Sequence, residues 1–225
     1  MFNKCETDLI KLSENVAKYC VGMEGNISGK VGNGLLIKAS GAKLNCLSKK
    51  DLVLFDFKGL QLSNFDNKGS MELEFHIHLM EFEDINYISH THPTNTIKIL
   101  CSTEYSKLFS EKRLFPDQVI FNGKKSCFIP YAKPGSDLNV VIKKCITSFI
   151  EIEKFFPKLI LLENHGIIAC GKTVDECVII TEICEKAAEI FIGAKMLGDI
   201  KFLTDKEIND LTNDKKEKYR QNLLK

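Results

Sequence analysis

The amino-acid sequence predicts an α/β or α+β fold, in which helices pack against a β-sheet. Short apolar runs of strand length alternate along the chain with longer segments that have helical periodicity. One pair of short runs flanks Asn122-Gly123, a dipeptide that favours a tight hairpin turn. The 225 residues are enough for one domain with a substantial core. A helical bundle and a β-sandwich are therefore disfavoured.

The first quarter of the chain is predicted to contain one helix and two strands. Apolar residues recur at three- and four-residue intervals over residues 6–21, as they do on the buried face of a helix. Continuous apolar runs predict strands over residues 34–39 and 52–57. Polar turns are expected at residues 25–28 and 40–41. Open backbone N–H groups in the first turn could bind an anion, and a plain connector is the alternative.

A second helix is predicted after a polar connector over residues 60–69. Ser70 has a side chain that commonly caps a helix N-terminus, and apolar positions continue with helical spacing to about Phe82. Glu72 and His76 are four residues apart and are therefore neighbours on one side of this helix. The helix would hold a carboxylate and an imidazole side by side.

A group of histidines follows an apolar run over residues 85–88, which predicts a strand. In an extended chain His90 and His92 project from the same face, and Pro93 ends the pairing because it has no N–H group. His165 lies far away in the sequence, after another apolar run. Neutral imidazoles are common ligands of divalent transition metals. The spacing therefore predicts a metal site, with core or surface histidines as the alternative.

The second half of the chain continues the mixture of helices and strands. Thr173 with Glu176, and Thr204 with Glu207, have the spacing of capping boxes that begin helices. The later predicted elements are a helix over 94–109, strands over 118–121 and 127–131, a helix from 136 to about 150, strands over 159–162 and 167–171, a helix from 173 to about 197, and a charged tail from 204.

The composition excludes several classes of function. The chain has 31 basic and 30 acidic residues and no basic patch, so no nucleic-acid partner is expected. No apolar run is long enough to span a membrane, and the first residues do not resemble a signal peptide, which predicts a cytoplasmic protein. Nine cysteines without a C-x-x-C pair are expected to be reduced thiols, with catalysis by Cys101 or Cys170 as a minor alternative.

Five short motifs occur in order along the chain: Gly25-Asn26-x-Ser28, Ser40-Gly41, Ser70-x-Glu72-x-x-x-His76, His90-x-His92-Pro93 and Asn164-His165-Gly166. With these motifs the chain resembles class II aldolase/adducin-like proteins, a family that includes fuculose- and rhamnulose-1-phosphate aldolases and ribulose-5-phosphate 4-epimerase. The resemblance implies a single three-layer domain over residues 1–203, whose central, mostly antiparallel sheet is flanked by helices. It leaves residues 204–225 as a charged tail that could dock on a neighbouring subunit, and it implies a homotetramer.

The resemblance also implies the composition of the active site. The side chains expected to hold zinc are those of His90, His92, His165 and Glu72. Glu72 would also act as the base, and another divalent transition metal is an alternative to zinc. The residues expected to bind the substrate's phosphate are Gly25, Asn26, Ser40, Gly41 and Ser70. His76 is expected to pack behind the ligands, and His78 to be exposed.

One departure from the family's pattern concerns the phosphate site. Relatives with phosphorylated substrates usually carry a second serine before the glutamate, where this chain has Met71. Lys38 is the candidate that would supply a compensating positive charge, and a solvated strand lysine is the alternative. The substrate is therefore expected to remain anionic. Glu72 itself favours aldol cleavage, because the epimerase branch generally has aspartate at the matching position.

The expected activity is that of a zinc-dependent aldehyde-lyase. Retro-aldol cleavage would convert a ketose phosphate, or a related anionic sugar, to dihydroxyacetone phosphate and an aldehyde through a metal-stabilised enediolate. Tyr131 and Tyr219 are candidates for a second acid or base near the aldehyde oxygen. The alternatives are a sugar-phosphate epimerase or dehydratase on the same scaffold, and a non-enzymatic adducin-like binding module.

Overall fold

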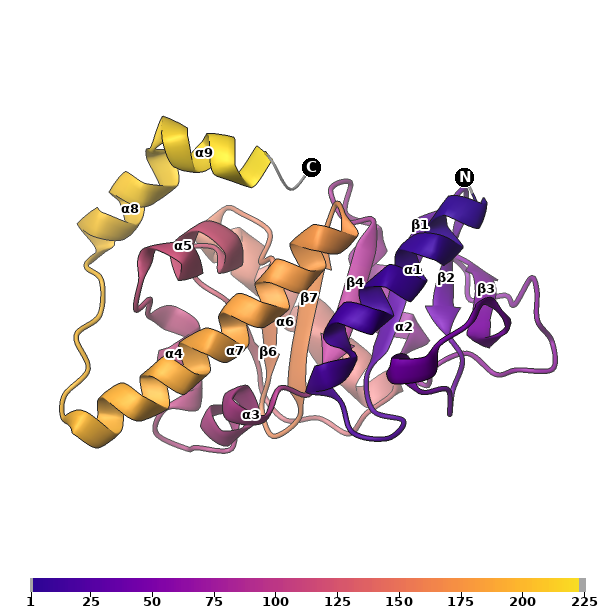
Figure 1. Cartoon of the computed structure of the whole chain (residues 1–225), viewed down its shortest axis with the longest axis horizontal. Helices are drawn as coiled ribbons and strands as arrows, with labels where there is room; N and C mark the ends of the chain where they lie inside the picture. Colours follow the sequence, from indigo (N-terminus) through magenta and orange to yellow (C-terminus); the bar gives the residue numbers. More distant parts are fainter. Residues whose placement is uncertain (1, 223–225) are drawn as a thin grey trace.

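The computed structural model describes residues 2–222, in which one seven-stranded sheet is covered by helices on both faces (Figure 1). The strands are β1 Asn26–Val31, β2 Gly34–Lys38, β3 Leu52–Asp56, β4 Tyr87–Thr91, β5 Cys127–Ile129, β6 Leu159–Leu162 and β7 Gly166–Gly171. The α-helices are α1 Phe2–Val16, α2 Leu73–Met80, α3 Thr94–Leu100, α4 Ser106–Glu111, α5 Pro116–Asn122, α6 Ser136–Glu153, α7 Val174–Leu197, α8 Asp205–Asn213 and α9 Lys215–Asn222.

The sheet is almost entirely antiparallel, with the strand order β3-β2-β1-β4-β7-β6-β5. The edge pair β5–β6 is parallel, and the other neighbouring pairs are antiparallel. Antiparallel neighbours can be joined by short turns, as β1 is to β2 and β6 is to β7. The predicted α/β architecture with a mostly antiparallel sheet flanked by helices is therefore confirmed.

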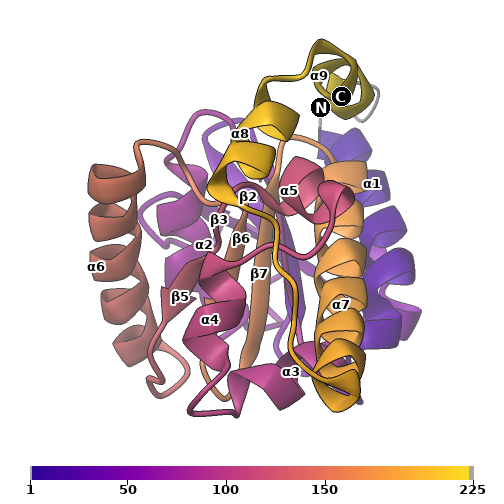
Figure 2. The same cartoon turned by 90° about the vertical axis from the view of Figure 1, so that its left-hand side faces the viewer.

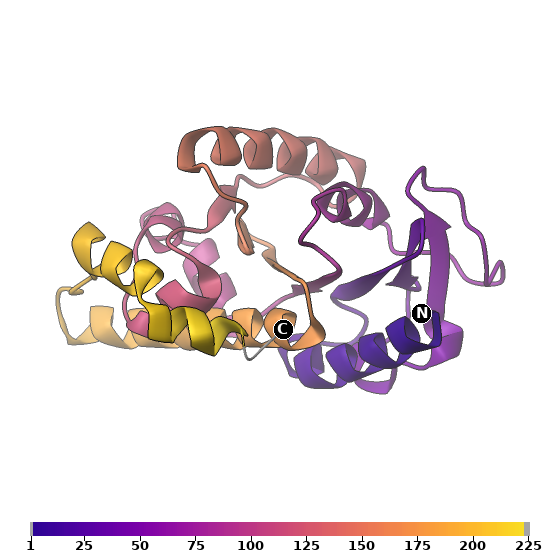
Figure 3. The ribbon, with the colours of Figure 1, turned by 90° about the horizontal axis from the view of Figure 1, so that it is seen from above.

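Helices form the two outer layers. α1 and α7 lie on one face of the sheet, and α2 and α6 lie on the other (Figure 2 and Figure 3). Leu12 of α1 shares an apolar cluster with Ile27 of β1, on the first face. On the second face Leu79 of α2 and Ile142 of α6 share a cluster with Ile37 of β2. Burial of each such side chain stabilises the fold by about 1.5–3 kcal/mol, so the central strands are fixed from both sides.

β4 lies at the centre of the sheet and brings distant segments of the chain together. Its His90 pairs with Asn26 of β1, and its Thr91 pairs with Ile167 of β7. The turn at residues 163–165, which joins β6 to β7, lies at the same end of the sheet. Segments from the beginning, middle and end of the chain therefore meet where β4 ends.

The predicted turn over residues 25–28 is wrong from Asn26 onward, because β1 begins there. Gly25 has a turn-like φ of +69°, but the residues after it pair in the sheet instead of presenting open N–H groups. Asn26 and Ser28 are polar, yet both side chains are buried and hydrogen-bonded to side chains of the α2 segment. These tertiary partners override the local turn preference of glycine, asparagine and serine.

The predicted strand over residues 118–121 is also wrong, because this segment lies in α5. Pro116 takes the first helical position, where its missing N–H group has no consequence. Gly123 follows the helix with a φ of +84°, so Asn122-Gly123 marks a helix end and not a hairpin. β5 forms within the predicted range 127–131 and pairs with β6 instead.

Helix boundaries differ from the prediction in several places. The helix predicted over residues 6–21 is α1, which spans Phe2–Val16. The predicted helix over residues 94–109 is interrupted between α3 and α4. Ser70 does not cap the first turn of α2, because the helix begins at Leu73 and Ser70 Oγ accepts a hydrogen bond from the Glu72 N–H group, at 3.2 Å. The predicted caps of α7 and α8 by threonine are confirmed.

The charged tail forms α8 and α9, which lie over α5 (Figure 1). Ile208 of α8 is buried, and Lys124 beside α5 donates a hydrogen bond to Asn209 at 2.7 Å. Arg220 of α9 lies 3.1 Å from Asp117 of α5. The tail thus contacts its own chain, while the domain boundary at residue 203 and docking on a neighbouring subunit remain predictions. No helix that the structure describes is both long and apolar enough to cross a membrane.

Candidate active site and metal centre

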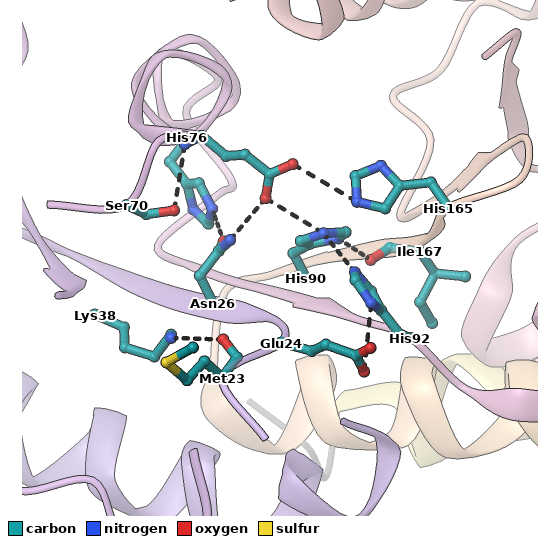
Figure 4. A network of polar contacts seen from close by, with 11 residues as sticks. Met23, Glu24, Asn26, Lys38, Ser70, His76, His90, His92, His165 and Ile167 are labelled. Atoms are coloured by element: carbon teal, nitrogen blue, oxygen red, sulfur yellow. Dashed lines mark hydrogen bonds and ion pairs between the residues drawn. The ribbon is translucent and has the colours of Figure 1, made fainter. Parts of the chain in front are cut away.

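Three histidines from separate parts of the chain converge at the end of β4 (Figure 4). His90 lies on the strand, His92 follows it, and His165 comes from the turn between β6 and β7. One ring nitrogen from each lies within 4.8 Å of the others, and the ring centroids are 4.8–5.0 Å apart. The predicted meeting of these three side chains is therefore found, and imidazole nitrogens at this spacing are able to share one ion.

The hydrogen bonds of the rings turn specific nitrogens toward the common point. His90 Nδ1 lies 2.9 Å from the carbonyl oxygen of Ile167, which can only accept, so Nδ1 carries the hydrogen and Nε2 has the lone pair. His90 Nε2 faces His92 Nε2 at 3.1 Å. Burial lowers the pKa of both rings to about 4, so both are neutral near pH 7. Burial has the same effect on the pKa of His165.

Glu72 places a carboxylate beside the histidines from the residue that precedes α2. Its Oε2 accepts a hydrogen bond from Asn26 Nδ2 at 2.8 Å and lies 3.3 Å from His90 Nε2. Its Oε1 is buried, accepts no hydrogen bond from residues 2–222, and lies 3.7 Å from His165 Nε2. A buried carboxylate oxygen without a donor is costly unless a ligand supplies one. Glu72 therefore has one tethered oxygen and one free oxygen.

The predicted anion-binding residues lie around the same cavity of about 200 Å³. The residues that line it are Met23, Gly25, Asn26, Lys38, Ser40, Gly41, Ser70, Met71, Glu72, His90, His92, Pro134 and His165. Every residue expected to hold the metal or to bind the phosphate is among them. Met23 and Pro134 were not predicted, because neither has a side chain that indicates chemistry.

Lys38 is not the solvated strand lysine that the sequence allowed as an alternative. The residue is 3% exposed, and its Nζ donates a hydrogen bond to the carbonyl oxygen of Ala42 at 2.6 Å. It donates another to the carbonyl oxygen of Met23 at 3.3 Å (Figure 4). Burial lowers the pKa of Lys38. Lys38 also lines the cavity that contains the histidine cluster, and no ion pair of its Nζ with a carboxylate is found among the described residues.

Two glycines allow the chain to come close to the ligand-bearing strand. A Cβ atom at Gly25 would lie 2.7 Å from the carbonyl oxygen of His90. A Cβ atom at Gly166 would lie 2.5 Å from the carbonyl oxygen of Thr91 and 2.7 Å from Cδ2 of His92. Side chains at either position would push the neighbouring segments away from β4. Glycine at both positions is therefore part of the architecture of the site.

The remaining candidates lie outside the cluster. His76 is fully buried behind it, as expected. His78 was expected to be exposed, but its side chain is 14% exposed and its Nδ1 lies 3.3 Å from Glu81. Tyr131 and Tyr219 are exposed and do not line the cavity.

A catalytic thiol has no support at the two cysteines considered. Cys170 is buried, and burial raises the pKa of its thiol, which keeps it protonated and unreactive. Cys101 is exposed at the end of α3 and does not line the cavity. The site residue that sequence reasoning missed is Glu24, whose Oε2 lies 3.6 Å from His92 Nδ1. Glu24 lies just before the motif that begins at Gly25, so no sequence pattern indicates that it contacts His92.

Comparisons with known proteins agree with this geometry. Residues 9–192 match the family described as Class II Aldolase and Adducin N-terminal domain. The chain is 30% identical over 188 residues to an L-fuculose phosphate aldolase of Methanococcus maripaludis, with 82% of this chain and 94% of the relative covered. It is 27% identical over 195 residues to a 5-deoxy-D-ribulose 1-phosphate aldolase of Bacillus thuringiensis, with 84% of each covered.

A solved structure has the same fold. The structure of an L-fuculose 1-phosphate aldolase aligns with a TM-score of 0.78 at 22% identity and covers 96% of both chains. The family match includes the segments that carry every residue expected to hold the metal or the phosphate. The chain therefore belongs to the class II aldolase and adducin family.

Proposed function

We propose that this class II aldolase, an enzyme of the lyase type, cleaves a ketose phosphate to dihydroxyacetone phosphate and an aldehyde with the help of zinc. The observation that carries the proposal is the meeting of His90, His92 and His165 beside a buried carboxylate with a free oxygen. A non-enzymatic binding module would have no use for this arrangement, because an unpartnered buried carboxylate oxygen destabilises the fold.

The donor set fits a divalent transition metal. His90, His92 and His165 would hold the ion through neutral ring nitrogens. Glu72 Oε1, which lies 3.7 Å from His165 Nε2 and accepts no hydrogen bond among the described residues, would serve as a fourth donor. The hydrogen bond from His90 Nδ1 to the Ile167 carbonyl supports this role, since ligating imidazoles commonly donate their other N–H group to the protein. When bound, the ion would polarise the substrate's carbonyl and stabilise the negative charge that develops as the carbon–carbon bond breaks.

The other end of the cavity is suited to the anionic group of the substrate. Lys38 Nζ supplies a buried positive charge, and the hydroxyl groups of Ser40 and Ser70 line the same space. Met71 offers no hydroxyl group to the phosphate, where related sites have a second serine that can donate a hydrogen bond. The positive charge of Lys38 would compensate for this missing hydrogen bond. A charge-assisted contact is stronger than a neutral one, which supports binding of a phosphate.

Glu72 would carry the proton transfers at the carbon skeleton. When the bond between C3 and C4 breaks, the C4 hydroxyl loses its proton as the aldehyde forms, and C3 receives a proton. Glu72 is the buried group beside the metal-binding histidines that can hold a proton and release it to C3, while the C4 proton passes to a separate base. The proton gained by that base and the proton given up by Glu72 would then be exchanged through solvent, so that the turnover balances. No tyrosine among the described residues lines the cavity, so the acid or base at the C4 oxygen is proposed to come from a second subunit of a homotetramer.

The cellular setting is proposed to be the cytoplasm. All nine cysteines are free thiols, which supports a reducing compartment.

The proposal is tested by incubating the purified, zinc-loaded protein with a panel of phosphorylated ketoses. Release of dihydroxyacetone phosphate together with an aldehyde is the expected result. Recovery of an epimer, a dehydrated product or carbon dioxide without an aldehyde would instead indicate another reaction on the same scaffold. A chelator should abolish cleavage without changing the far-UV circular dichroism, because the apolar clusters on both faces of the sheet do not include the three histidines.

A further inference from the structure

Four polar side chains form a hydrogen-bonded chain that ends on Glu72. Ser28 Oγ lies 2.6 Å from His76 Nδ1, and the His76 Nε2 atom lies in hydrogen-bond contact with Asn26 Oδ1. Asn26 Nδ2 then lies 2.8 Å from Glu72 Oε2. Figure 4 shows His76 and Asn26 facing each other beside the histidine cluster. These hydrogen bonds connect β1 to the α2 segment and lead to Glu72.

The direction of each hydrogen bond in this chain is determined. Asn26 presents its amide NH₂ group to Glu72 and donates from Nδ2 to Oε2. Asn26 Oδ1 therefore faces His76 and can only accept, which requires the hydrogen to be on His76 Nε2. His76 Nδ1 is then unprotonated and accepts from the Ser28 hydroxyl group. All donors point toward Glu72, and no member is left without a partner.

The surroundings leave little freedom for another arrangement. His76 and Ser28 are fully buried, and Asn26 is 5% exposed. Phe75 stacks on the His76 ring with a centroid distance of 4.5 Å and meets the edge of His90 at 5.9 Å. A rotated Asn26 amide would place its oxygen against Glu72 Oε2, so two acceptors would face each other. His76 is the group that distinguishes the two amide orientations.

We propose that His76 is a positioning residue, which holds the Asn26 amide so that it tethers Oε2 of Glu72 and leaves Oε1 as the reactive oxygen. The first part stands on the hydrogen-bond geometry alone, while the reactivity of Oε1 rests on the proposed function. Without the histidine the amide can rotate, and Glu72 then loses the contact that sets its orientation. Turnover should fall although no atom of His76 touches the cavity.

The tautomer of His76 can be measured without any activity. In the resting full-length protein labelled with ¹⁵N-histidine, long-range ¹H–¹⁵N correlation spectra distinguish a protonated ring nitrogen from an unprotonated one. The proposal predicts a His76 ring with hydrogen on Nε2 and none on Nδ1, assigned by the signal that is absent from His76→Gln. A hydrogen on Nδ1, or an imidazolium ring, would overturn it.

A double-mutant cycle separates positioning from a structural role. His76→Leu should lower kcat by about 10- to 100-fold with little change in KM, the size of effect found when groups that support metal or catalytic residues are removed. In a Glu72→Gln background the same substitution should lower the residual kcat no further, because His76 acts through Glu72. An equal loss in both backgrounds would show that His76 serves the fold and not Glu72.

Two further variants keep the cycle interpretable. His76→Gln retains an amide donor for Asn26 and should recover part of the lost kcat, which also covers the case in which His76→Leu does not fold. His78→Leu removes a half-buried histidine that lies in the same helix but takes no part in the hydrogen bonds that lead to Glu72. This substitution should leave kcat unchanged. Loss of activity in His78→Leu equal to that in His76→Leu would contradict the proposal. If the unmodified protein cleaves no ketose phosphate, the proposed function fails while the tautomer result still stands.

Discussion

Glu72 and Arg113 are both buried charged residues, yet their surroundings are opposite. The Arg113 guanidinium donates to the carbonyl oxygens of Ser110, Lys112 and Gly123 and to the Ser126 hydroxyl group, at 2.7–3.2 Å. Three of these acceptors lie at the ends of α4 and α5, where helix dipoles concentrate negative charge. Glu72 instead keeps one oxygen without a hydrogen bond among the described residues.

The difference separates a structural charge from a functional one. A buried charge whose hydrogen-bonding capacity is filled by the backbone fixes the fold, since any change leaves several groups unpaired. A buried charged group that lacks one of its hydrogen-bond partners is tolerated where a ligand or substrate supplies that partner. Arg113 should therefore control stability without affecting chemistry, and Glu72 should control chemistry with little effect on stability.

The largest effect is expected for Glu72→Gln. The amide keeps the hydrogen bond from Asn26 but cannot exchange a proton with the substrate, so kcat should fall by roughly 10²–10⁴-fold. The free energy of unfolding should stay within about 1 kcal/mol or rise, because a buried charge has been removed. Steady-state kinetics and urea unfolding measure the two quantities. Nearly intact turnover would refute the assignment of Glu72 as the base.

Arg113→Met tests the other half of the comparison. Four acceptors, two of them in fully buried hydrogen bonds, would lose their donor, so the free energy of unfolding should decrease by roughly 2–4 kcal/mol, while the folded fraction keeps its kcat/KM. Arg220→Met is the matched control, because its ion pairs are on the surface and should contribute less than about 1 kcal/mol. Equal destabilisation by the two substitutions would contradict the structural role of Arg113.

Lys38 lies between these extremes, because its Nζ is buried with two carbonyl acceptors and still lines the cavity. Lys38→Met should raise KM for a phosphorylated substrate by roughly 10- to 100-fold, the contribution of one hydrogen bond to a charged group. Lys58→Met, an exposed lysine near β3, should leave KM unchanged. A KM that does not respond to Lys38→Met would remove Lys38 from the anion site.

The smallest effect is expected at Glu24, which contacts His92 from an exposed loop. Glu24→Ala removes a carboxylate that can orient the His92 ring, so zinc affinity should fall by roughly 10-fold. Competition with a chelating dye measures this affinity directly. Glu81→Ala, which removes the carboxylate next to His78, serves as the control and should have no effect. Equal zinc affinities for both variants would show that Glu24 does not support His92.

The sequence predicted the site more completely than it predicted the fold around it. The three histidines and Glu72 are recognisable because they lie in short motifs whose residue types and spacing are local properties of the sequence. The role of Asn26 as part of a strand was missed, because its partners come from another element and local preference favours a turn. For the same reason the sequence predicts a hairpin at Asn122-Gly123, although the structure has the end of a helix there.

The central claim is that imidazoles from β4 and from the β6–β7 turn share one ion. Calorimetric titration of metal-free protein with zinc tests it most directly, with His165→Ala and His78→Ala measured alongside. We expect about one zinc per chain in the unmodified protein and in His78→Ala, and loss of high-affinity binding in His165→Ala. High-affinity binding that survives His165→Ala unchanged would contradict a shared site.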